Sequence, residues 1–323
     1  MAMAVRLGRF CLAMVLVFGL VVSCAVPAPV PPKVPVLLFL QASPDRLTLE
    51  AIVPNSLVRY AGGIDGAKQM LNADNDPLVM LQFGKALAEF QPTSRNVVDT
   101  FGAIAIFKLA QPFRQNRVLA QQGIAILPRS RYEPLPPASP SFQYNCSATV
   151  QAIALDLGRQ EFRKMGVEQS ATARTAISSL VCADLDGDQN PEIVAGLRLD
   201  NPLRPIADDV QAWQRFLNLP PEQRQEYSLL IKLYQSGNTW LSEPIIRHTR
   251  ALSYLNDSIS SYVLANAYDL NGDRRLELVV QEIGLSTMNV WLLTPDLQTT
   301  DPNRSKWLDY YLPERSLEIK ETG

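Results

Sequence analysis

The chain has 323 residues, with 30 lysines and arginines, 32 aspartates and glutamates, and a single histidine. This nearly balanced charge argues against nucleic acid as a partner, and no cluster of basic residues supports one. A single histidine excludes zinc chemistry that needs several histidine ligands.

Residues 1–23 have the pattern of a secretory signal peptide. Arg6 and Arg9 precede the apolar run Cys11–Val22, which is too short to span a bilayer securely. The run leads into Val-Val-Ser-Cys24, which resembles the lipobox of bacterial lipoproteins. The resemblance implies that Cys24 is lipidated and that the protein is extracytoplasmic, anchored to a membrane at the periplasm or the cell surface. The alternatives are an uncleaved anchor and an ordinary signal peptide.

Two proline clusters divide the rest of the chain. Residues 24–44 form a proline-rich segment that favours polyproline II and is expected to act as a tether. A second cluster predicts a linker at residues 128–141. We therefore expect one region at residues 45–127 and another at residues 142–323.

The first of these regions is predicted to be mainly helical. Asp76-Pro77 has the pattern of a helix start, with aspartate as the N-cap and proline in the first turn. Apolar residues follow at helical spacing from Leu78 to Phe90. Residues 96–109 and 113–126 are further helix candidates.

The second region is predicted to consist of strands and turns. The strand candidates are residues 151–157, 177–183, 193–199, 229–234, 263–268, 276–283 and 290–293. Ser236-Gly237-Asn238 favours a hairpin between residues 228–235 and 239–246. One insertion, residues 205–225, has the apolar spacing of a helix.

The four cysteines are expected to have different fates. Cys11 leaves with the signal peptide, and Cys24 is the residue predicted to carry lipid. Cys146 and Cys182 remain, and an even pair outside the cytoplasm favours a disulfide bond. Two buried thiols are the alternative.

Two loops of the second region repeat each other. Each carries an oxygen-bearing side chain at loop positions 1, 3, 5 and 9, with leucine at position 2 and glycine at position 4. These side chains are Asp184, Asp186, Asp188 and Glu192 in the first loop, and Asp269, Asn271, Asp273 and Glu277 in the second. Alternate oxygen ligands that converge on one point suit a hard cation such as Ca²⁺. The EF-hand is excluded, because its glycine at position 6 and glutamate at position 12 are missing.

This pattern resembles the FG-GAP or VCBS repeat, the calcium loop of integrin-like β-propeller blades, written D-x-D-G-D-x-x-x-D. The resemblance implies a further ligand at position 7, the backbone carbonyl of Asn190 or of Arg275. Position 9 is usually aspartate in the family and is glutamate in both loops here. The alternative is a pair of acidic turns between strands, because Asp, Asn and Gly are common in turns.

The fold class expected from these features is α+β, with a helical N-terminal region and a β-rich, propeller-like domain. The roughly 180 residues after the second proline cluster hold about three four-stranded blades, whereas a closed propeller has about 4–8. The predicted propeller is therefore partial or irregular.

The predicted function is binding or scaffolding at the cell envelope, with up to two structural Ca²⁺ ions and a protein or carbohydrate ligand. The alternative is a cell-surface hydrolase acting on polysaccharide or peptide. His248 lacks any supporting catalytic motif and is expected to be structural. A pocket lined by acids outside both loops would favour the hydrolase, and an exposed aromatic or apolar patch would favour binding.

Overall fold

The chain is β-rich, and its described strands form three sheets. The computed structural model describes residues 36–38, 47–72, 76–82, 85–99, 102–111, 124–129, 142–143, 146–183, 185, 192–268, 270, 275–296, 306–313 and 317–321. Contacts divide the chain after Pro32, and Lys33–Gly323 forms one compact unit. The predicted lipidation site, Cys24, lies outside the described residues.

The first sheet contains seven antiparallel strands in the order β4-β3-β7-β1-β2-β6-β5. Its strands are β1 (Val36–Leu38), β2 (Thr48–Ile52), β3 (Leu78–Gln82), β4 (Lys85–Phe90), β5 (Pro92–Asp99), β6 (Ala103–Leu109) and β7 (Ile124–Pro128). Two short helices, α2 (Asn55–Tyr60) and α3 (Ile64–Asn72), connect β2 to β3. Both helices contribute leucines to the core of this region.

The prediction of a mainly helical first region is wrong. Leu78–Phe90 forms β3 and β4 instead of a helix, and residues 96–109 fall in β5 and β6. The reason is visible in β6, where alternate residues Ala103, Ala105 and Phe107 are buried, which is the period of a strand. Asp76-Pro77 leads into β3, and the Pro77 carbonyl accepts the backbone N–H of Arg129 at 2.8 Å, which continues the pairing of β3 with β7.

Two more assignments in this part of the chain differ from the structure. Val36–Leu38, which was placed in the proline-rich tether, is a strand between β2 and β7. Of the expected helix at residues 113–126, only residues 124–126 are described, and they begin β7. The predicted linker at residues 128–141 starts at the last residue of β7, and residues 130–141 are outside the described part.

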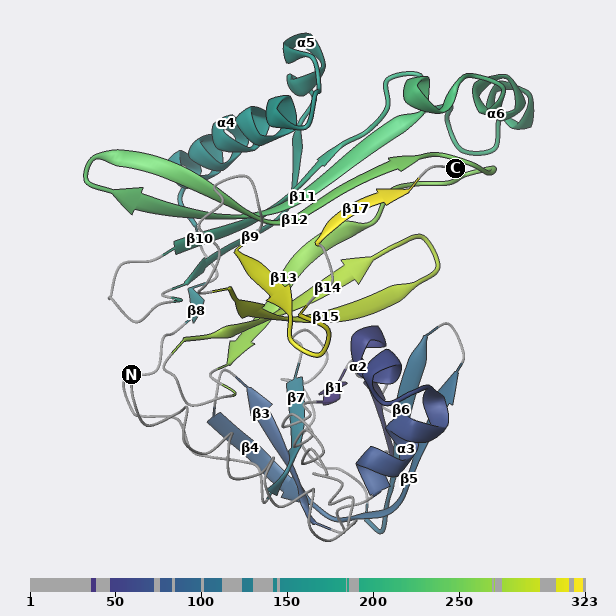
Figure 1. Ribbon diagram of the computed structural model, residues 1–323, viewed down its shortest axis with the longest axis vertical. Coiled ribbons are helices and arrows are strands. Elements are labelled where there is room, and N and C mark those ends of the chain that lie inside the picture. The colour runs from purple at the N-terminus through teal and green to yellow at the C-terminus, as the bar shows by residue number, and fades with distance from the viewer. Residues whose placement is uncertain are drawn as a thin grey trace, which may run out of the picture. The chain divides into compact units, whose positions relative to one another are not determined.

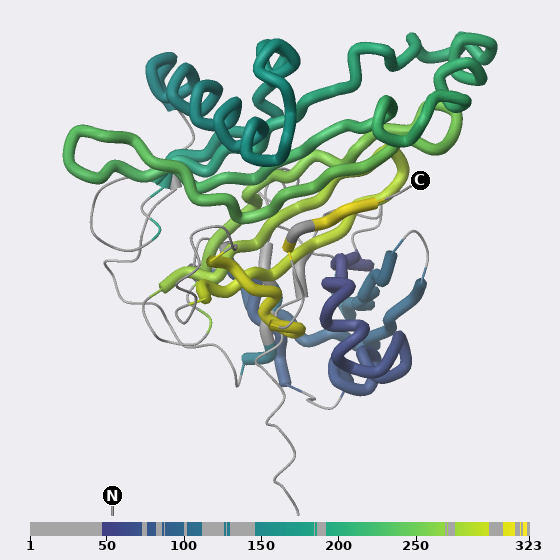
Figure 2. The backbone as a smooth tube through the Cα atoms, turned by 45° about the horizontal axis from the view of Figure 1, so that its top comes forward, coloured from purple at the N-terminus to yellow at the C-terminus, as the bar shows by residue number. Residues whose placement is uncertain are grey.

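The second sheet has six strands in the order β17-β12-β11-β10-β9-β8. Its strands are β8 (Phe142–Gln143), β9 (Ala176–Ala183), β10 (Glu192–Leu199), β11 (Gln225–Ser236), β12 (Thr239–Ala251) and β17 (Glu318–Glu321). All pairs are antiparallel except β12 with β17. The helix α4 (Ala148–Lys164) lies along one face, followed by α5 (Gln169–Thr172), as Figure 1 and Figure 2 show.

Most strand predictions for this half are confirmed, but residues 151–157 belong to α4. Ser147 begins that helix by accepting the N–H of Val150, and Ala154, Leu157 and Phe162 face the sheet at helical spacing. The hairpin is confirmed: Ser236 pairs with Thr239, and Gly237 takes a left-handed φ of 60°. The helix predicted in residues 205–225 is α6 (Val210–Leu217), followed by the 3₁₀ helix η3 (Pro221–Gln223).

The third sheet is an antiparallel meander of four strands. They are β13 (Ser261–Tyr268), β14 (Glu277–Ile283), β15 (Met288–Pro295) and β16 (Trp307–Asp309). The two faces of this sheet pack into two different hydrophobic cores. Val280 and Leu293 pack with Val194 of the second sheet, whereas Val279 and Leu292 join Phe107 of the first.

A disulfide bond joins Cys146 to Cys182, the pair expected from the sequence, with 5.9 Å between the two Cα atoms. Cys146 precedes α4, and Cys182 lies near the end of β9. The bond therefore attaches the start of the helix to the sheet that the helix covers.

We expect loss of this bond to lower the free energy of unfolding by about 3–4 kcal/mol, because it closes a loop of 36 residues. Urea unfolding of the protein with and without reductant measures the effect. The double variant Cys146→Ser/Cys182→Ser should match the reduced protein and should not respond to reductant. Alkylation of two thiols in the unfolded, unreduced protein would contradict the prediction.

Candidate functional site

The two repeated loops close hairpins of the same register. Ala183 of β9 pairs with Glu192 of β10, and Tyr268 of β13 pairs with Glu277 of β14. Residues 184–191 and 269–276 lie between these pairs, so eight residues separate the paired positions in each copy, and the glutamate at position 9 begins the second strand. Each hairpin also begins a four-stranded antiparallel meander, β9 to β12 and β13 to β16 (Figure 1).

The glutamate at position 9 makes the same contact in both loops. The backbone N–H of Leu185 donates to Glu192 Oε2 at 2.6 Å, and that of Leu270 donates to Glu277 Oε2 at 2.7 Å. Both leucines and both glutamates are buried. A buried carboxylate requires hydrogen bonds, and an N–H donor to a charged oxygen makes a short, strong one. The glutamate thus ties the end of its loop to the beginning.

The other carboxylate oxygen of this glutamate, Oε1, contacts a different side chain in each copy. Glu192 Oε1 lies 3.8 Å from Lys232 Nζ, whereas Glu277 Oε1 accepts a hydrogen bond from Thr294 Oγ1 at 3.4 Å. Lys232 and Thr294 both lie on the third strand of their meander. The negative charge of Glu277 also reaches Tyr310, whose pKa is raised by burial and, secondarily, by that charge.

Most of the predicted metal ligands are not among the described residues. These are Asp184, Asp186, Asp188, Asn190, Asp269, Asn271 and Asp273. Arg275, whose carbonyl was expected to bind the ion, is exposed and stands two residues before β14. In the part of the chain that the structure describes, no three His, Cys, Asp or Glu residues gather in a way that could hold a metal. The calcium assignment therefore remains a prediction.

The strands that lead into both loops are fixed from outside the hairpin. Cys182, in the disulfide, is two residues before the first loop. Tyr268, the residue before the second loop, donates its hydroxyl to the Leu81 carbonyl of the first sheet at 3.1 Å. Each loop therefore starts from a strand end that another part of the fold holds in place.

The single histidine lies between the second and third sheets. His248 is buried, its Nδ1 is 2.9 Å from the Tyr262 hydroxyl, and its Nε2 is 3.5 Å from Glu321 Oε1. These contacts link β12 to β13 and to the C-terminal strand β17. They agree with the structural role expected for this residue.

Sequence reasoning missed the hydrogen bond inside each loop and the partners on the third strands. The loop repeat alone could have indicated the first, because leucine at position 2 and glutamate at position 9 recur in both copies. Lys232 and Thr294 depend on the register of strands that are not adjacent to the loops in sequence. No family model matches the chain, and comparisons with curated proteins and with solved structures find no match.

We expect Glu277→Ala to lower the free energy of unfolding by about 1–3 kcal/mol in EDTA, because the buried N–H of Leu270 loses its acceptor. Glu277→Gln keeps an acceptor oxygen and should lose less. Urea unfolding in EDTA measures both variants. Exposed Glu222→Ala is the control, with an expected change within about 0.5 kcal/mol. A Glu277→Ala protein as stable as this control would contradict the contact.

Proposed function

We propose that the protein is an extracytoplasmic lipoprotein that binds Ca²⁺ at its two repeated loops and serves in binding or scaffolding at the cell envelope. The observation that carries the proposal is the repetition of one loop sequence, closed by the same hydrogen bond in hairpins of the same register. Both copies have the same length, the same buried leucine and the same buried glutamate tied to the second residue.

Calcium fits the chemistry of both loops. Ca²⁺ takes six to eight oxygen ligands, and carboxylates are its usual charged ones. The sequence supplies four carboxylates to the first loop and three carboxylates with one amide to the second. A divalent cation would offset the mutual repulsion of these groups and hold each turn between its two strands.

The two loops should differ in affinity, but less than a count of carboxylates implies. The first loop has one carboxylate more. However, Lys232 places a positive charge 3.8 Å from Glu192, and this charge opposes a metal ion at the first loop. The second loop has the neutral Thr294 hydroxyl at the corresponding glutamate.

Binding is favoured over the hydrolase alternative by the surface of the described part. Large apolar side chains are exposed before and at the start of α6, at Leu203, Ile206 and Val210. A pocket between α4 and the β11–β12 hairpin is lined by a single acid, Asp156. A glycoside hydrolase of the usual kind needs two carboxyl groups, so this pocket does not support one.

The two meanders also support the proposed propeller-like arrangement. Each has four strands with a loop of the calcium type between the first and second, and the two pack face to face. Two such units are fewer than the about 4–8 blades of a closed propeller. The proposed arrangement is therefore a partial one.

Calcium binding is tested by titration calorimetry at millimolar Ca²⁺, the range of extracellular calcium modules. We expect Ca²⁺ to raise the melting temperature and EDTA to lower it, because a ligand of the folded state stabilises that state. Asp186→Ala should remove most of this response and Asn271→Ala a smaller part, with Asp65→Ala on α3 as the control. The proposal is falsified if no heat of binding is found and EDTA leaves the melting temperature unchanged.

Membrane attachment is proposed to depend on Cys24, because Val-Val-Ser-Cys24 resembles a lipobox. No helix in the described residues is both long and apolar enough to cross a bilayer. We expect mass spectrometry of the mature protein to find an acylated N-terminal cysteine. Cys24→Ser should move the protein from the membrane fraction to the soluble fraction. An intact signal peptide, or an unmodified N-terminus at another residue, would exclude lipidation.

A further inference from the structure

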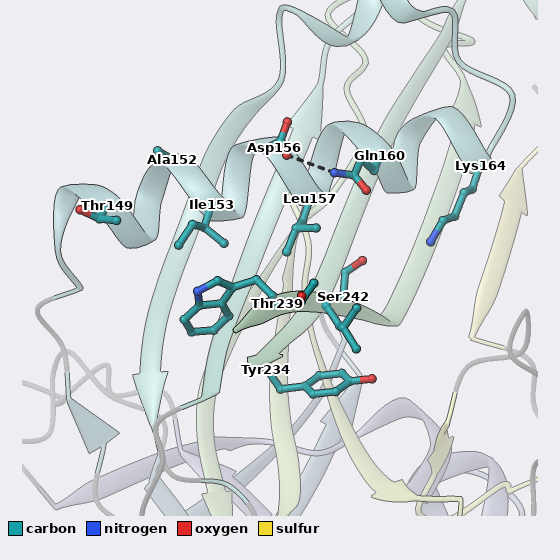
Figure 3. A pocket seen from close by; sticks show the side chains of 12 residues that line it. Thr149, Ala152, Ile153, Asp156, Leu157, Gln160, Lys164, Tyr234, Thr239 and Ser242 are labelled. Atoms are coloured by element: carbon teal, nitrogen blue, oxygen red, sulfur yellow. Dashed lines mark hydrogen bonds between the residues drawn. The ribbon is translucent and has the colours of Figure 1, made fainter. Parts of the chain in front are cut away.

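A groove of about 750 Å³ runs between α4 and the β11–β12 hairpin. Figure 3 shows Thr149 near one end of the helical wall and Lys164 near the other. At 1.5 Å per residue, this stretch of helix is about 20 Å long. The groove is therefore extended along the helix, and its length suits a chain-like ligand.

Both ends of the groove are held by strong contacts. At the start of α4, the disulfide of Cys146 fixes the helix to β9. Near its end, the buried carboxylate of Glu161 accepts hydrogen bonds from Ser242 Oγ at 2.7 Å and Lys164 Nζ at 2.6 Å. The same carboxylate lies 3.4 Å from an Arg247 nitrogen on β12. The walls are thus positioned before any ligand arrives, as in most small-molecule sites.

The lining combines an apolar surface with neutral polar groups. Ile153 and Leu157 of α4 face the hairpin, and the partly buried indole of Trp240 packs in the same cluster. The polar lining residues without charge are Thr149, Gln160, Tyr234, Thr239 and Ser242. Ser242 donates its proton to Glu161 and can accept from a ligand, whereas the other side chains have groups that both donate and accept.

The charged side chains of the groove lining give it a net charge of zero. Asp156 and Lys164 are the acid and the base among the lining residues, and Gln160 Nε2 donates to Asp156 Oδ2 at 3.1 Å. A groove with no net charge does not favour an anionic polymer or a lipid headgroup. The carboxylate of Asp156 is exposed and already accepts from Gln160, and it can accept a further hydrogen bond from a ligand that has a donor.

We propose that this groove binds a neutral, extended glycan chain. Sugar hydroxyls donate and accept hydrogen bonds, which matches the threonine, serine and glutamine side chains and the Asp156 carboxylate. The apolar faces of pyranose rings suit the indole of Trp240 and the neighbouring Ile153 and Leu157. A proline-rich peptide also binds to aromatic grooves, and the experiment below separates that occupant from a glycan. The assignment rests on the binding role proposed above and names its ligand class.

The test is titration calorimetry of the mature protein with cellohexaose and with the hexamer of N-acetylglucosamine, two neutral β-1,4-linked oligosaccharides. We expect a Kd of the order of 10⁻⁴ M for at least one of them. Trp240→Ala should weaken binding at least tenfold, and Asp156→Ala, at an exposed position, about threefold or more. Tyr254→Ala removes a half-exposed aromatic ring outside the groove lining and should leave the Kd unchanged.

Several results would overturn the glycan assignment. One is the absence of binding by either oligosaccharide at millimolar concentration. Another is binding that neither Trp240→Ala nor Asp156→Ala weakens. Since Trp240 also packs against α4, the Asp156→Ala protein decides the question if Trp240→Ala does not fold. Binding of a peptide with the sequence of residues 25–35, without binding of either oligosaccharide, would identify a polyproline groove instead.

The calcium proposal and the glycan proposal can fail separately. Oligosaccharide binding is measured in Ca²⁺ and again in EDTA, with the melting temperature recorded in each. Oligosaccharide binding by a protein that shows no Ca²⁺ response would support the groove and contradict the calcium loops. A clear Ca²⁺ response without oligosaccharide binding in either buffer would do the reverse.

Discussion

The burial of the third sheet on both faces is the constraint on which the rest of the described fold depends. Consecutive residues of its strands enter opposite cores, Val279 and Leu292 toward the first sheet, Val280 and Leu293 toward the second. A sheet covered on both faces needs apolar residues at nearly every position, and Glu277–Val280 are all buried. The glutamate in this run is tolerated because it starts the strand and is hydrogen-bonded to the loop.

The repeated loops show how a polar group can be held at the end of such a strand. In both copies a carboxylate accepts a backbone N–H of the second loop residue, so the mouth of the loop is closed by a bond that needs no metal. Glutamate is one methylene longer than the aspartate usual at this position in the repeats that the loops resemble. In both copies the glutamate side chain reaches from the start of the second strand to the second residue of the loop.

An element could be predicted from the sequence where its residue pattern fits only one type of secondary structure. β9, β10, β13 and β14 were predictable because apolar runs of strand length flank turn residues. Leu78–Phe90 was not, because short apolar runs fit helical and strand spacing alike, and pairing with β7 decided the outcome. Residues 151–157 were mistaken for a strand for the same reason, and their helix is fixed by packing on the second sheet. The pairing of Cys146 with Cys182 was inferred from the expected compartment, whereas Lys232 and Thr294 required the strand register.

The disulfide has a mechanical consequence when the chain is pulled along its backbone. Residues 147–181 lie inside the covalent ring closed by Cys146 and Cys182. Tension applied along the backbone from either side passes through the sulfur atoms and bypasses α4, α5 and most of β9. A pulling force would therefore extend other segments first, while the helical wall beside the β11–β12 hairpin carries none of the stretch.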